Sequence, residues 1–286
     1  MESFRSWWER NRQEFKALMF DIDGTLISAG KLLPGAEEFL AHLRESAFPF
    51  CLLTNDGNHS TEEKSVLMAA AGLHVSPDEI VSCSMALEEY AEEHRCKGKS
   101  FFIMGDLGDP CYALRAGLLP CRDIRGIEAC DGVIVGEGSY NWQDNIHAVF
   151  NYLVRHPEKP LIVPNPDSYW PGRVKGEYGI GAGAKARFIC GLLNEMGIAK
   201  EPLYFGKPYA KIYEYALHRM TARFKLDPMP QMPEILMIGD SLSSDIRGAN
   251  RLGIRSLLVL TGITSAAQAA EAKGELRPAL VFADLS

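Results

Sequence analysis

The feature that most constrains the fold of this chain is the regular alternation of short apolar runs with amphipathic stretches. Short apolar runs predict buried β-strands, and the amphipathic stretches predict the helices that connect one parallel strand to the next. The pattern therefore predicts an α/β fold with a Rossmann-like, doubly wound parallel sheet as its core. The strands expected in this core cover residues 17–20, 50–53, 203–205, 235–238 and 257–260.

A second block of expected strands lies between the two parts of the core. Its expected elements are strands over residues 100–104, 132–135 and 161–163 and a helix over residues 145–154. A chain of 286 residues is long enough for either one large domain or two. We interpret residues 86–186 as an inserted α/β cap domain, which leaves residues 1–85 and 187–286 as the two parts of the core.

The composition is ordinary for a globular protein and argues against several classes of partner. The net charge of −7 provides no basic excess to displace the counterions of a nucleic acid polymer. No apolar run is long enough to cross a bilayer, and charged residues interrupt the segment before Lys16, so we expect neither a membrane partner nor a secretory signal. The seven cysteines are scattered and form no Cys-x-x-Cys pair, which favours free thiols in a reducing compartment. We therefore expect a cytoplasmic protein.

An acid pair, Asp21 and Asp23, follows the first expected strand. Gly24, directly after the pair, permits the chain to turn at the end of the strand, so that both carboxylates can serve one site. A carboxylate at the strand end can attack phosphorus, and the second one can protonate the leaving oxygen and later activate water. The simpler interpretation is an acidic turn that only ends the strand.

Two further signals follow strands in the same way. The hydroxyl of Thr54 and the backbone N–H of Asn55 could bind a phosphoryl oxygen, although a Thr-Asn pair also starts turns. The ammonium of Lys207 could neutralise charge on a transferring group, although most lysines are solvated surface residues. Because the carboxyl ends of parallel strands form one edge of a sheet, we expect these side chains at the same edge as Asp21.

The fourth signal consists of Asp240 and Asp245. Asp240 directly follows an expected strand and its Gly, and together with Asp21 it could bind a small hard cation through oxygen ligands, which suits Mg²⁺. Asp245 has two interpretations of similar weight. It either holds the metal-binding residues in place without binding the metal itself, or it is a favourable acid at the start of a helix.

The order of these four signals resembles the four-motif signature of the haloacid dehalogenase superfamily. Within that superfamily the chain is similar to the NagD-like phosphatases, in which the cap is inserted between the second and third motifs. The resemblance covers nearly the whole chain after Lys16. It extends to residues 132–136, 140–142, 165–167 and 259–265.

This resemblance implies a role for each signal. Asp21 would be the nucleophile, and Asp23 would be the general acid and base. The phosphate contacts would come from Thr54, Asn55 and Lys207. Mg²⁺ would be held by Asp21, by the backbone carbonyl of Asp23 and by Asp240.

The expected cap carries the candidate residues for substrate specificity, Asn165 and Asp167, on a loop that Pro166 stiffens. A plain Asx-type turn is the alternative interpretation of this loop. Two segments depart from the family pattern and leave the substrate contacts open. They are residues 56–59, where many relatives have a serine-rich turn, and residues 137–139.

The segment before Lys16 is longer than the family usually has. As a helix it would bring Phe4, Trp8 and Phe15 roughly to one side, most simply for packing on the core. Binding of a partner is the alternative. This aromatic segment and the cap surface are the two places where a homodimer could form.

The predicted function is Mg²⁺-dependent hydrolysis of a small phosphorylated metabolite through an aspartyl-phosphate intermediate. Nucleoside monophosphates, sugar phosphates and aryl phosphates all remain open as substrates. A phosphomutase or phosphotransferase would share Asp21 and Asp23 but would return the phosphoryl group to a sugar. A non-catalytic phospho-ligand sensor is less favoured, because carboxylates without a task beside a phosphate would weaken its binding.

Overall fold

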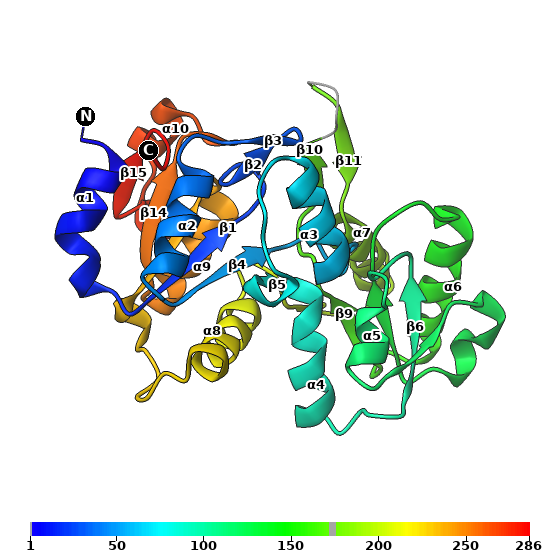
Figure 1. Cartoon of the computed structure of the whole chain (residues 1–286). Helices are drawn as coiled ribbons and strands as arrows, with labels where there is room; N and C mark the ends of the chain where they lie inside the picture. Colours follow the sequence, from blue (N-terminus) through cyan, green and yellow to red (C-terminus); the bar gives the residue numbers. More distant parts are fainter. Residues whose placement is uncertain (1, 172–175) are drawn as a thin grey trace. The chain divides into compact units, whose positions relative to one another are not determined.

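The computed structural model describes residues 2–171 and 176–286 of the chain (Figure 1). Its contacts divide the chain into two compact units. The first unit consists of Met1–Thr54, Lys64–Val81 and Lys207–Ser286. The second unit consists of Asn55–Glu63 and Ser82–Gly206.

The first unit is built on a six-stranded sheet with the order β15-β14-β13-β1-β4-β5. The chain starts in the middle with β1, moves outward through β4 to β5, and resumes on the other side of β1 with β13, β14 and β15. Strands β4, β1, β13, β14 and β15 run parallel. This doubly wound order confirms the predicted core. The strands are β1 (Ala17–Asp21), β4 (Phe50–Thr54), β5 (Ile80–Ser82), β13 (Ile235–Gly239), β14 (Arg255–Val259) and β15 (Leu280–Phe282).

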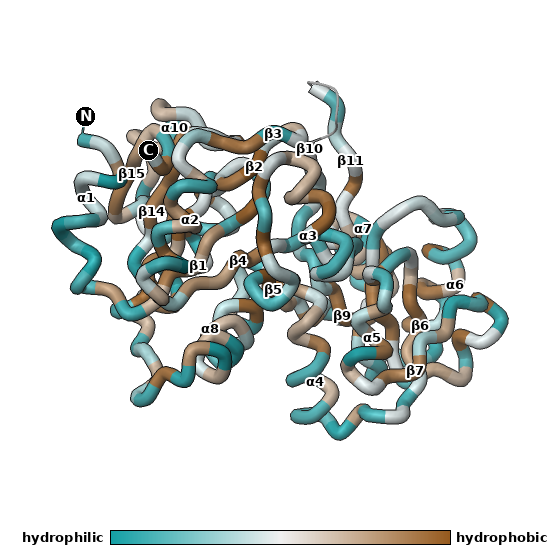
Figure 2. Tube along the Cα trace, in the orientation of Figure 1, coloured by the Kyte–Doolittle hydropathy of each residue, from teal (hydrophilic) through white to brown (hydrophobic). Residues whose placement is uncertain are grey.

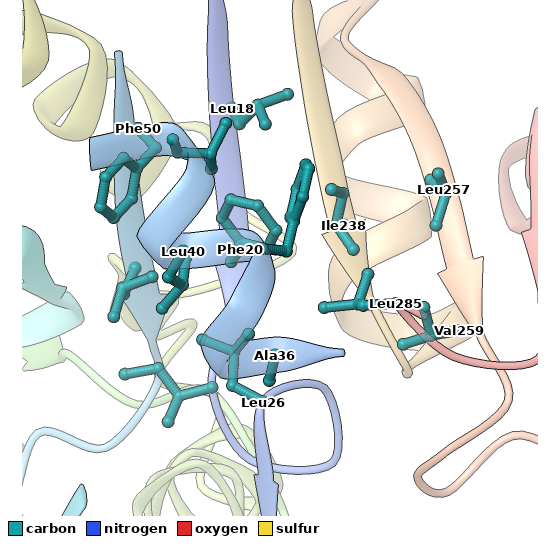
Figure 3. Packing of buried hydrophobic residues seen from close by; sticks show 14 of the residues in the cluster. Leu18, Phe20, Leu26, Ala36, Leu40, Phe50, Ile238, Leu257, Val259 and Leu285 are labelled. Atoms are coloured by element: carbon teal, nitrogen blue, oxygen red, sulfur yellow. The ribbon is translucent and has the colours of Figure 1, made fainter. Parts of the chain in front are cut away.

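Helices cover both faces of this sheet. Every residue of β1, β4 and β13 is buried, which explains why these strands appear in the sequence as continuous apolar runs. On one face Phe20 and Ile238 pack with Leu40 of α2 (Ala36–Glu45), as Figure 3 shows. On the other face Cys51 lies near Met220 of α8 (Ala210–Phe224), while Leu258 packs with the turn that precedes α9 (Arg247–Leu252).

Further short elements belong wholly or mostly to the first unit. The short strands β2 (Ile27–Ser28) and β3 (Lys31–Leu32) form an antiparallel pair after β1. Helix α3 (Thr61–Ala70) follows β4, and α10 (Ala266–Glu271) lies between β14 and β15 in the chain. Helix α2 starts directly after Gly35, which adopts a positive φ of 79°.

The aromatic amino-terminal segment packs on the core, as predicted. Helix α1 (Phe4–Asn11) begins after Ser3, whose side chain accepts a hydrogen bond from the Ser6 N–H. Phe4 and Trp8 are buried in the same cluster as Phe39, and the ring centroids of Phe4 and Phe39 lie 4.7 Å apart. Phe15 joins this cluster from outside the helix, because α1 has already ended when the chain reaches it.

The second unit has a five-stranded parallel sheet with the order β12-β9-β8-β6-β7. Helices α6 and α7 pack with the apolar side chains of this sheet. Its strands are β6 (Ser100–Met104), β7 (Leu119–Cys121), β8 (Gly132–Val135), β9 (Leu161–Val163) and β12 (Leu203–Tyr204). A separate antiparallel pair consists of β10 (Tyr169–Pro171) and β11 (Tyr178–Ile180). The helices are α4 (Leu87–Glu93), α5 (Tyr112–Arg115), α6 (Trp142–Arg155) and α7 (Ala182–Glu195).

The boundaries of the second unit differ from those expected for the cap. Helix α7 and strand β12 were expected in the core, but β12 pairs with β9, and α7 packs in the core of the second unit. The chain therefore returns to the first unit at Lys207 rather than at residue 187. The reason is that a very short apolar run looks the same whichever sheet it joins. Only its pairing, Leu203 with Ile162, identifies the sheet.

Hydropathy follows this architecture. Figure 2 shows apolar residues along strands such as β6, whereas much of α1 is hydrophilic. Across the described ranges, no helix combines the length and the apolar character that a membrane span requires. All seven cysteines are free thiols, as predicted.

Candidate active site

The site lies where β1 and its two neighbouring strands end. Strand β1 ends at Asp21, which is in register with Leu53, so that Thr54 lies one residue further along β4. On the other side Phe20 is in register with Ile238, and Asp240 directly follows β13. The strand order reverses between β1 and β13, and open α/β sheets bind their ligands beyond the carboxyl ends of the strands at this point.

Three buried carboxylates converge there. Oxygens of Asp21, Asp240 and Asp245 all lie within 4.8 Å of one another. Asp240 Oδ2 accepts a hydrogen bond of 2.7 Å from the Ile263 N–H, and Asp245 Oδ2 accepts one of 3.0 Å from the Ser241 N–H. These backbone donors hold the Asp240 and Asp245 carboxylates in place.

Gly24 makes room for this cluster. Its φ of +94° confirms the turn that was expected after the acid pair. A Cβ at this position would lie 2.3 Å from Asp240 Oδ2, which is closer than any real contact. The turn thus brings the backbone against a carboxylate that is distant in the sequence, and a side chain at position 24 would displace it.

Lys207 joins the cluster from the segment that follows β12. Its ammonium hydrogen-bonds Asp21 Oδ1, lies 2.8 Å from Asp245 Oδ1, and donates to the Leu53 carbonyl at 3.3 Å. The Lys207 side chain is only 2% exposed. Two interpretations of Asp245 were left open. Its contact with Lys207 favours the one in which Asp245 holds the other site residues in place.

Burial controls the protonation of these groups. Burial raises the pKa of Asp21 well above its usual value, with opposition from the Lys207 ammonium. Burial and the charge of Asp245 raise the pKa of Asp240 to about 7. Burial alone would lower the pKa of Lys207, but the adjacent carboxylates of Asp21 and Asp245 outweigh it and raise that pKa well above its usual value.

This donor set fits a hard divalent cation. Three carboxylates and one ammonium leave two net negative charges in a buried space, which two positive charges would neutralise. The raised pKa values of Asp21 and Asp240 report the repulsion and desolvation that such a cation would relieve. Carboxylate oxygens are also the ligands that hard cations prefer.

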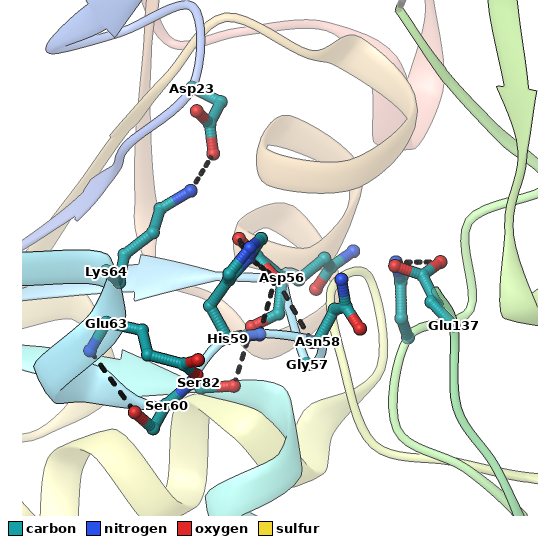
Figure 4. A network of polar contacts seen from close by, with 12 residues as sticks. Asp23, Asp56, Gly57, Asn58, His59, Ser60, Glu63, Lys64, Ser82 and Glu137 are labelled. Atoms are coloured by element: carbon teal, nitrogen blue, oxygen red, sulfur yellow. Dashed lines mark hydrogen bonds and ion pairs between the residues drawn. The ribbon is translucent and has the colours of Figure 1, made fainter. Parts of the chain in front are cut away.

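Asp23 lies just beyond the buried cluster. Its backbone forms an isolated bridge with Ile27, and its side chain is 61% exposed. The Nζ of Lys64, from α3, lies 2.7 Å from Asp23 Oδ2 (Figure 4). Sequence reasoning missed Lys64, because nothing distinguishes a lysine on an amphipathic helix from a solvated surface lysine.

In the second unit, the loop with Asn165 and Asp167 is held at both ends. Asn165 Oδ1 accepts a hydrogen bond from the Asp167 N–H at 2.9 Å, which is the Asx-type turn of the alternative interpretation. Beyond that turn, Asn55 Nδ2 donates to Asp167 Oδ2 at 3.1 Å. Asn55 and Asp167 are thus brought together, although they are far apart in the sequence.

Glu137 is a further residue whose contacts the sequence did not reveal. Its Oε1 accepts hydrogen bonds from Asn165 Nδ2 at 3.0 Å and from the Ala182 N–H at 3.1 Å. Burial raises the pKa of Glu137 above its usual value, although the Ala182 N–H opposes this shift. Glu137 therefore anchors the Asn165 loop to the start of α7, in a segment where the sequence departs from the family pattern.

The loop at residues 56–59 closes on its own acid. Asp56 Oδ1 accepts hydrogen bonds from the N–H groups of Asn58 and His59, and the His59 ring lies 2.9 Å from Asp56 Oδ2 (Figure 4). In addition, Ser82 Oγ donates to the Asp56 carbonyl at 2.8 Å. The side chain of Asp56 thus accepts the hydrogen bonds that order this turn.

Two family models match the chain. Residues 18–118 match a model described as haloacid dehalogenase-like hydrolase, and residues 204–286 match one described as HAD-hydrolase-like. Together they cover most of the chain, and residues 119–203 of the second unit lie between the two matches.

Individual relatives extend this match across the second unit. The chain is 30% identical over 251 residues to ribonucleotide monophosphatase NagD of Escherichia coli K12, a match that covers 87% of this chain and 89% of the relative. It is 25% identical over 248 residues to dihydroxyacetone phosphatase of Corynebacterium glutamicum, covering 87% and 82% of the two chains.

Solved structures agree with the sequence relatives. NagD from E. coli K-12 superimposes with a TM-score of 0.77 at 27% identity, over 95% of this chain and 97% of the other. A structure described as a possible sugar phosphatase of the HAD superfamily from Cytophaga hutchinsonii gives a TM-score of 0.80 at 27% identity, over 100% and 98%. The fold, the family models and the relatives all agree, and the chain belongs to the haloacid dehalogenase-like hydrolases as a phosphatase of the NagD-like branch.

Proposed function

We propose that this phosphatase is a Mg²⁺-dependent hydrolase of small phosphomonoesters that acts through an aspartyl-phosphate on Asp21. The observation that supports this most directly is the convergence of Asp21, Asp240 and Asp245 with Lys207 at the ends of β1 and β13. A buried nucleophile beside a buried ammonium, with surplus negative charge for a cation, suits attack on a phosphoryl group.

The proposed reaction has two steps. In the first, a carboxylate oxygen of Asp21 forms a bond to phosphorus, the ester P–O bond breaks, and the leaving oxygen takes a proton from Asp23. In the second, Asp23 takes a proton from water, whose oxygen bonds to phosphorus while the bond to Asp21 breaks. Inorganic phosphate leaves, and both aspartates return to their starting states.

The other predicted residues bind the phosphoryl group and the metal. Thr54 and Asn55 would donate hydrogen bonds to phosphoryl oxygens, and Lys207 would neutralise their charge. Mg²⁺ would be held by Asp21, Asp240 and the backbone carbonyl of Asp23. When bound, it supplies positive charge that offsets the negative charge of the phosphoryl oxygens.

The substrate is proposed to be a small phosphorylated metabolite. The relatives are named for a ribonucleotide monophosphate and for dihydroxyacetone phosphate, and another is described as a possible sugar phosphatase. These names support a small ester but differ in the leaving group. The proposal therefore extends to nucleoside monophosphates, sugar phosphates and aryl phosphates as candidates.

Release of inorganic phosphate at several Mg²⁺ concentrations and pH values tests this function. We expect no release without a divalent cation. Since the pKa of Asp240 without metal is about 7, a proton occupies this ligand below pH 7 and the cation must displace it. The apparent Mg²⁺ affinity should therefore rise as the pH is raised through about 7.

Three outcomes would contradict the proposal. Release that is independent of the cation would exclude the metal role. Transfer of the phosphoryl group to a sugar in preference to water would indicate a phosphomutase or phosphotransferase. Binding of phosphate esters without any release would indicate a sensor.

The loop with Asn165 and Asp167 is expected to select the ester. Asn165→Ala and Asp167→Ala should each lower kcat/KM for the preferred metabolite by up to about tenfold, which corresponds to the loss of one hydrogen bond. A small aryl phosphate should lose less than about threefold, because a leaving group with few contacts has little binding energy to lose. The measurement is kcat/KM across a panel of esters.

Asn141→Ala is a matched control in the second unit. Asn141 caps α6 by accepting a hydrogen bond from the Asp144 N–H, so its loss should lower stability by about 1 kcal/mol. It should not change the ranking of substrates. Equal losses for all esters in the Asn165 and Asp167 variants would show that the loop supports the chemistry or the fold and does not select the ester.

A further inference from the structure

A lysine is buried where stability alone does not favour one. Lys64 is the fourth residue of α3, and its side chain is only 8% exposed. The positive end of the helix dipole favours acids in this first turn, as at Glu62 and Glu63, and disfavours an ammonium. Burial of the ammonium adds a desolvation cost. Lys64 therefore occupies a position that is doubly unfavourable for its charge.

The ion pair with Asp23 adds little stability of its own. Asp23 is mostly exposed, and ion pairs with an exposed partner contribute little to the stability of a fold. An apolar side chain of similar length would fill the same space without the desolvation cost. This ion pair therefore matters more for the position of the Asp23 carboxylate than for the stability of the fold.

Asp23 itself needs a partner to hold its position. Its carboxylate is exposed on the turn after β1, where its backbone forms a bridge with Ile27. Among the described residues, the carboxylate makes its one hydrogen bond with Lys64, through Oδ2 at 2.7 Å. Oδ1 stays available for a proton. Figure 4 shows the extended Lys64 side chain reaching from α3 to this carboxylate.

We propose that Lys64 is a positioning residue for Asp23. This inference rests on the proposed role of Asp23 as general acid and base. The Lys64 ammonium holds Oδ2 throughout the reaction, so that Oδ1 gives its proton to the leaving oxygen in the first step and takes one from water in the second. Because a displacement of about 1 Å can slow a reaction on the order of 100-fold, fixing an exposed carboxylate has a large effect on rate.

A double-mutant cycle tests this role. Lys64→Met keeps the length of the side chain and removes the charge, and Lys64→Arg keeps the charge. Both are made in the native chain, and Lys64→Met is also combined with Asp23→Asn. The readouts are kcat and KM for one ester at saturating Mg²⁺, per folded molecule, together with Tm.

The control is Lys16→Met. Lys16 forms an ion pair of equal length, 2.7 Å, with Glu234, but it precedes β1 at the end opposite to Asp21. Its loss should change neither kcat nor KM. Any general effect of removing a lysine from the first unit will appear in this variant.

We expect Lys64→Met to lower kcat by about 10- to 100-fold with KM within about twofold, and Lys64→Arg to restore part of the loss. In the Asp23→Asn background, Lys64→Met should have no further effect, because the two residues act through one group. A purely structural role would lower Tm and leave kcat per folded molecule unchanged.

Two results would overturn the inference. One is an unchanged kcat in Lys64→Met while Asp23→Asn loses activity. The other is a double variant whose loss of kcat equals the product of the losses in the two single variants. Full activity in Asp23→Asn would instead overturn the proposed role of Asp23 itself. The failure of the inference and the failure of the proposed function are therefore distinguishable.

Discussion

Asp21→Asn should reduce phosphate release on the order of 10⁴-fold or more and leave the fold intact. The amide occupies the same volume as the carboxylate but cannot attack phosphorus. The loss should appear in kcat for every ester, because the nucleophile is common to all of them. Acid-quenched native protein should carry a phosphoryl group on Asp21 by mass spectrometry, and the variant should carry none.

The stability of this variant follows from the contacts of Lys207. Removing one partner of a buried ion pair is often costly, but Lys207 keeps Asp245 at 2.8 Å and the Leu53 carbonyl. The substitution also removes the repulsion between Asp21 and the other two carboxylates. We therefore expect the free energy of unfolding to change by no more than about 2 kcal/mol. Wild-type phosphate release by a folded Asp21→Asn variant would exclude the covalent mechanism.

Asp240→Ala should weaken the apparent affinity for Mg²⁺ by about 100-fold or more. The protein provides few direct ligands to this ion, and Mg²⁺ gives up its waters reluctantly, so each carboxylate is important. Activity should be recovered only in part at high Mg²⁺ concentration. The measurement is phosphate release as a function of Mg²⁺ concentration, together with calorimetric titration of Mg²⁺ without substrate.

Two further variants separate metal binding from other effects of this change. Asp240→Asn can still accept the hydrogen bond from Ile263 but is a weaker ligand, so it should also lose Mg²⁺ affinity while retaining the native Tm. Asp227→Ala removes an exposed acid from the first unit and should leave the titration unchanged. Unaltered Mg²⁺ dependence in both Asp240 variants would show that Asp240 is not a ligand.

The sequence was most informative where the chemistry depends on strand ends. An apolar run followed at once by a polar residue places that residue at the carboxyl edge of a parallel sheet, whatever the rest of the chain does. Asp21, Thr54 and Asp240 were found in this way. The structure places Asp21 and Thr54 at the ends of β1 and β4 and Asp240 directly after β13. The turn at Gly24 could also be expected, because a glycine directly after the acid pair readily adopts a positive φ.

The sequence was least informative where a long side chain or a short strand decides the arrangement. The run at residues 203–205 reads as a core strand, and only its pairing with β9 places β12 in the second unit. Likewise, α7 is amphipathic and would suit either sheet. The second unit therefore extends further than the expected cap before the chain returns to the first unit, whereas the α/β class and the doubly wound core were confirmed.

The sequence by itself thus determined the fold class, the family and the strand-end positions of the acids, because these depend on local periodicity and on the residue after each strand. Only the tertiary structure decided which charges meet. The contacts of Lys207 with Asp245, of Lys64 with Asp23 and of Asn55 with Asp167 join residues distant in the chain. A flexible lysine side chain leaves no periodic trace of its direction, and its partner becomes known only when packing has fixed the backbone on both sides.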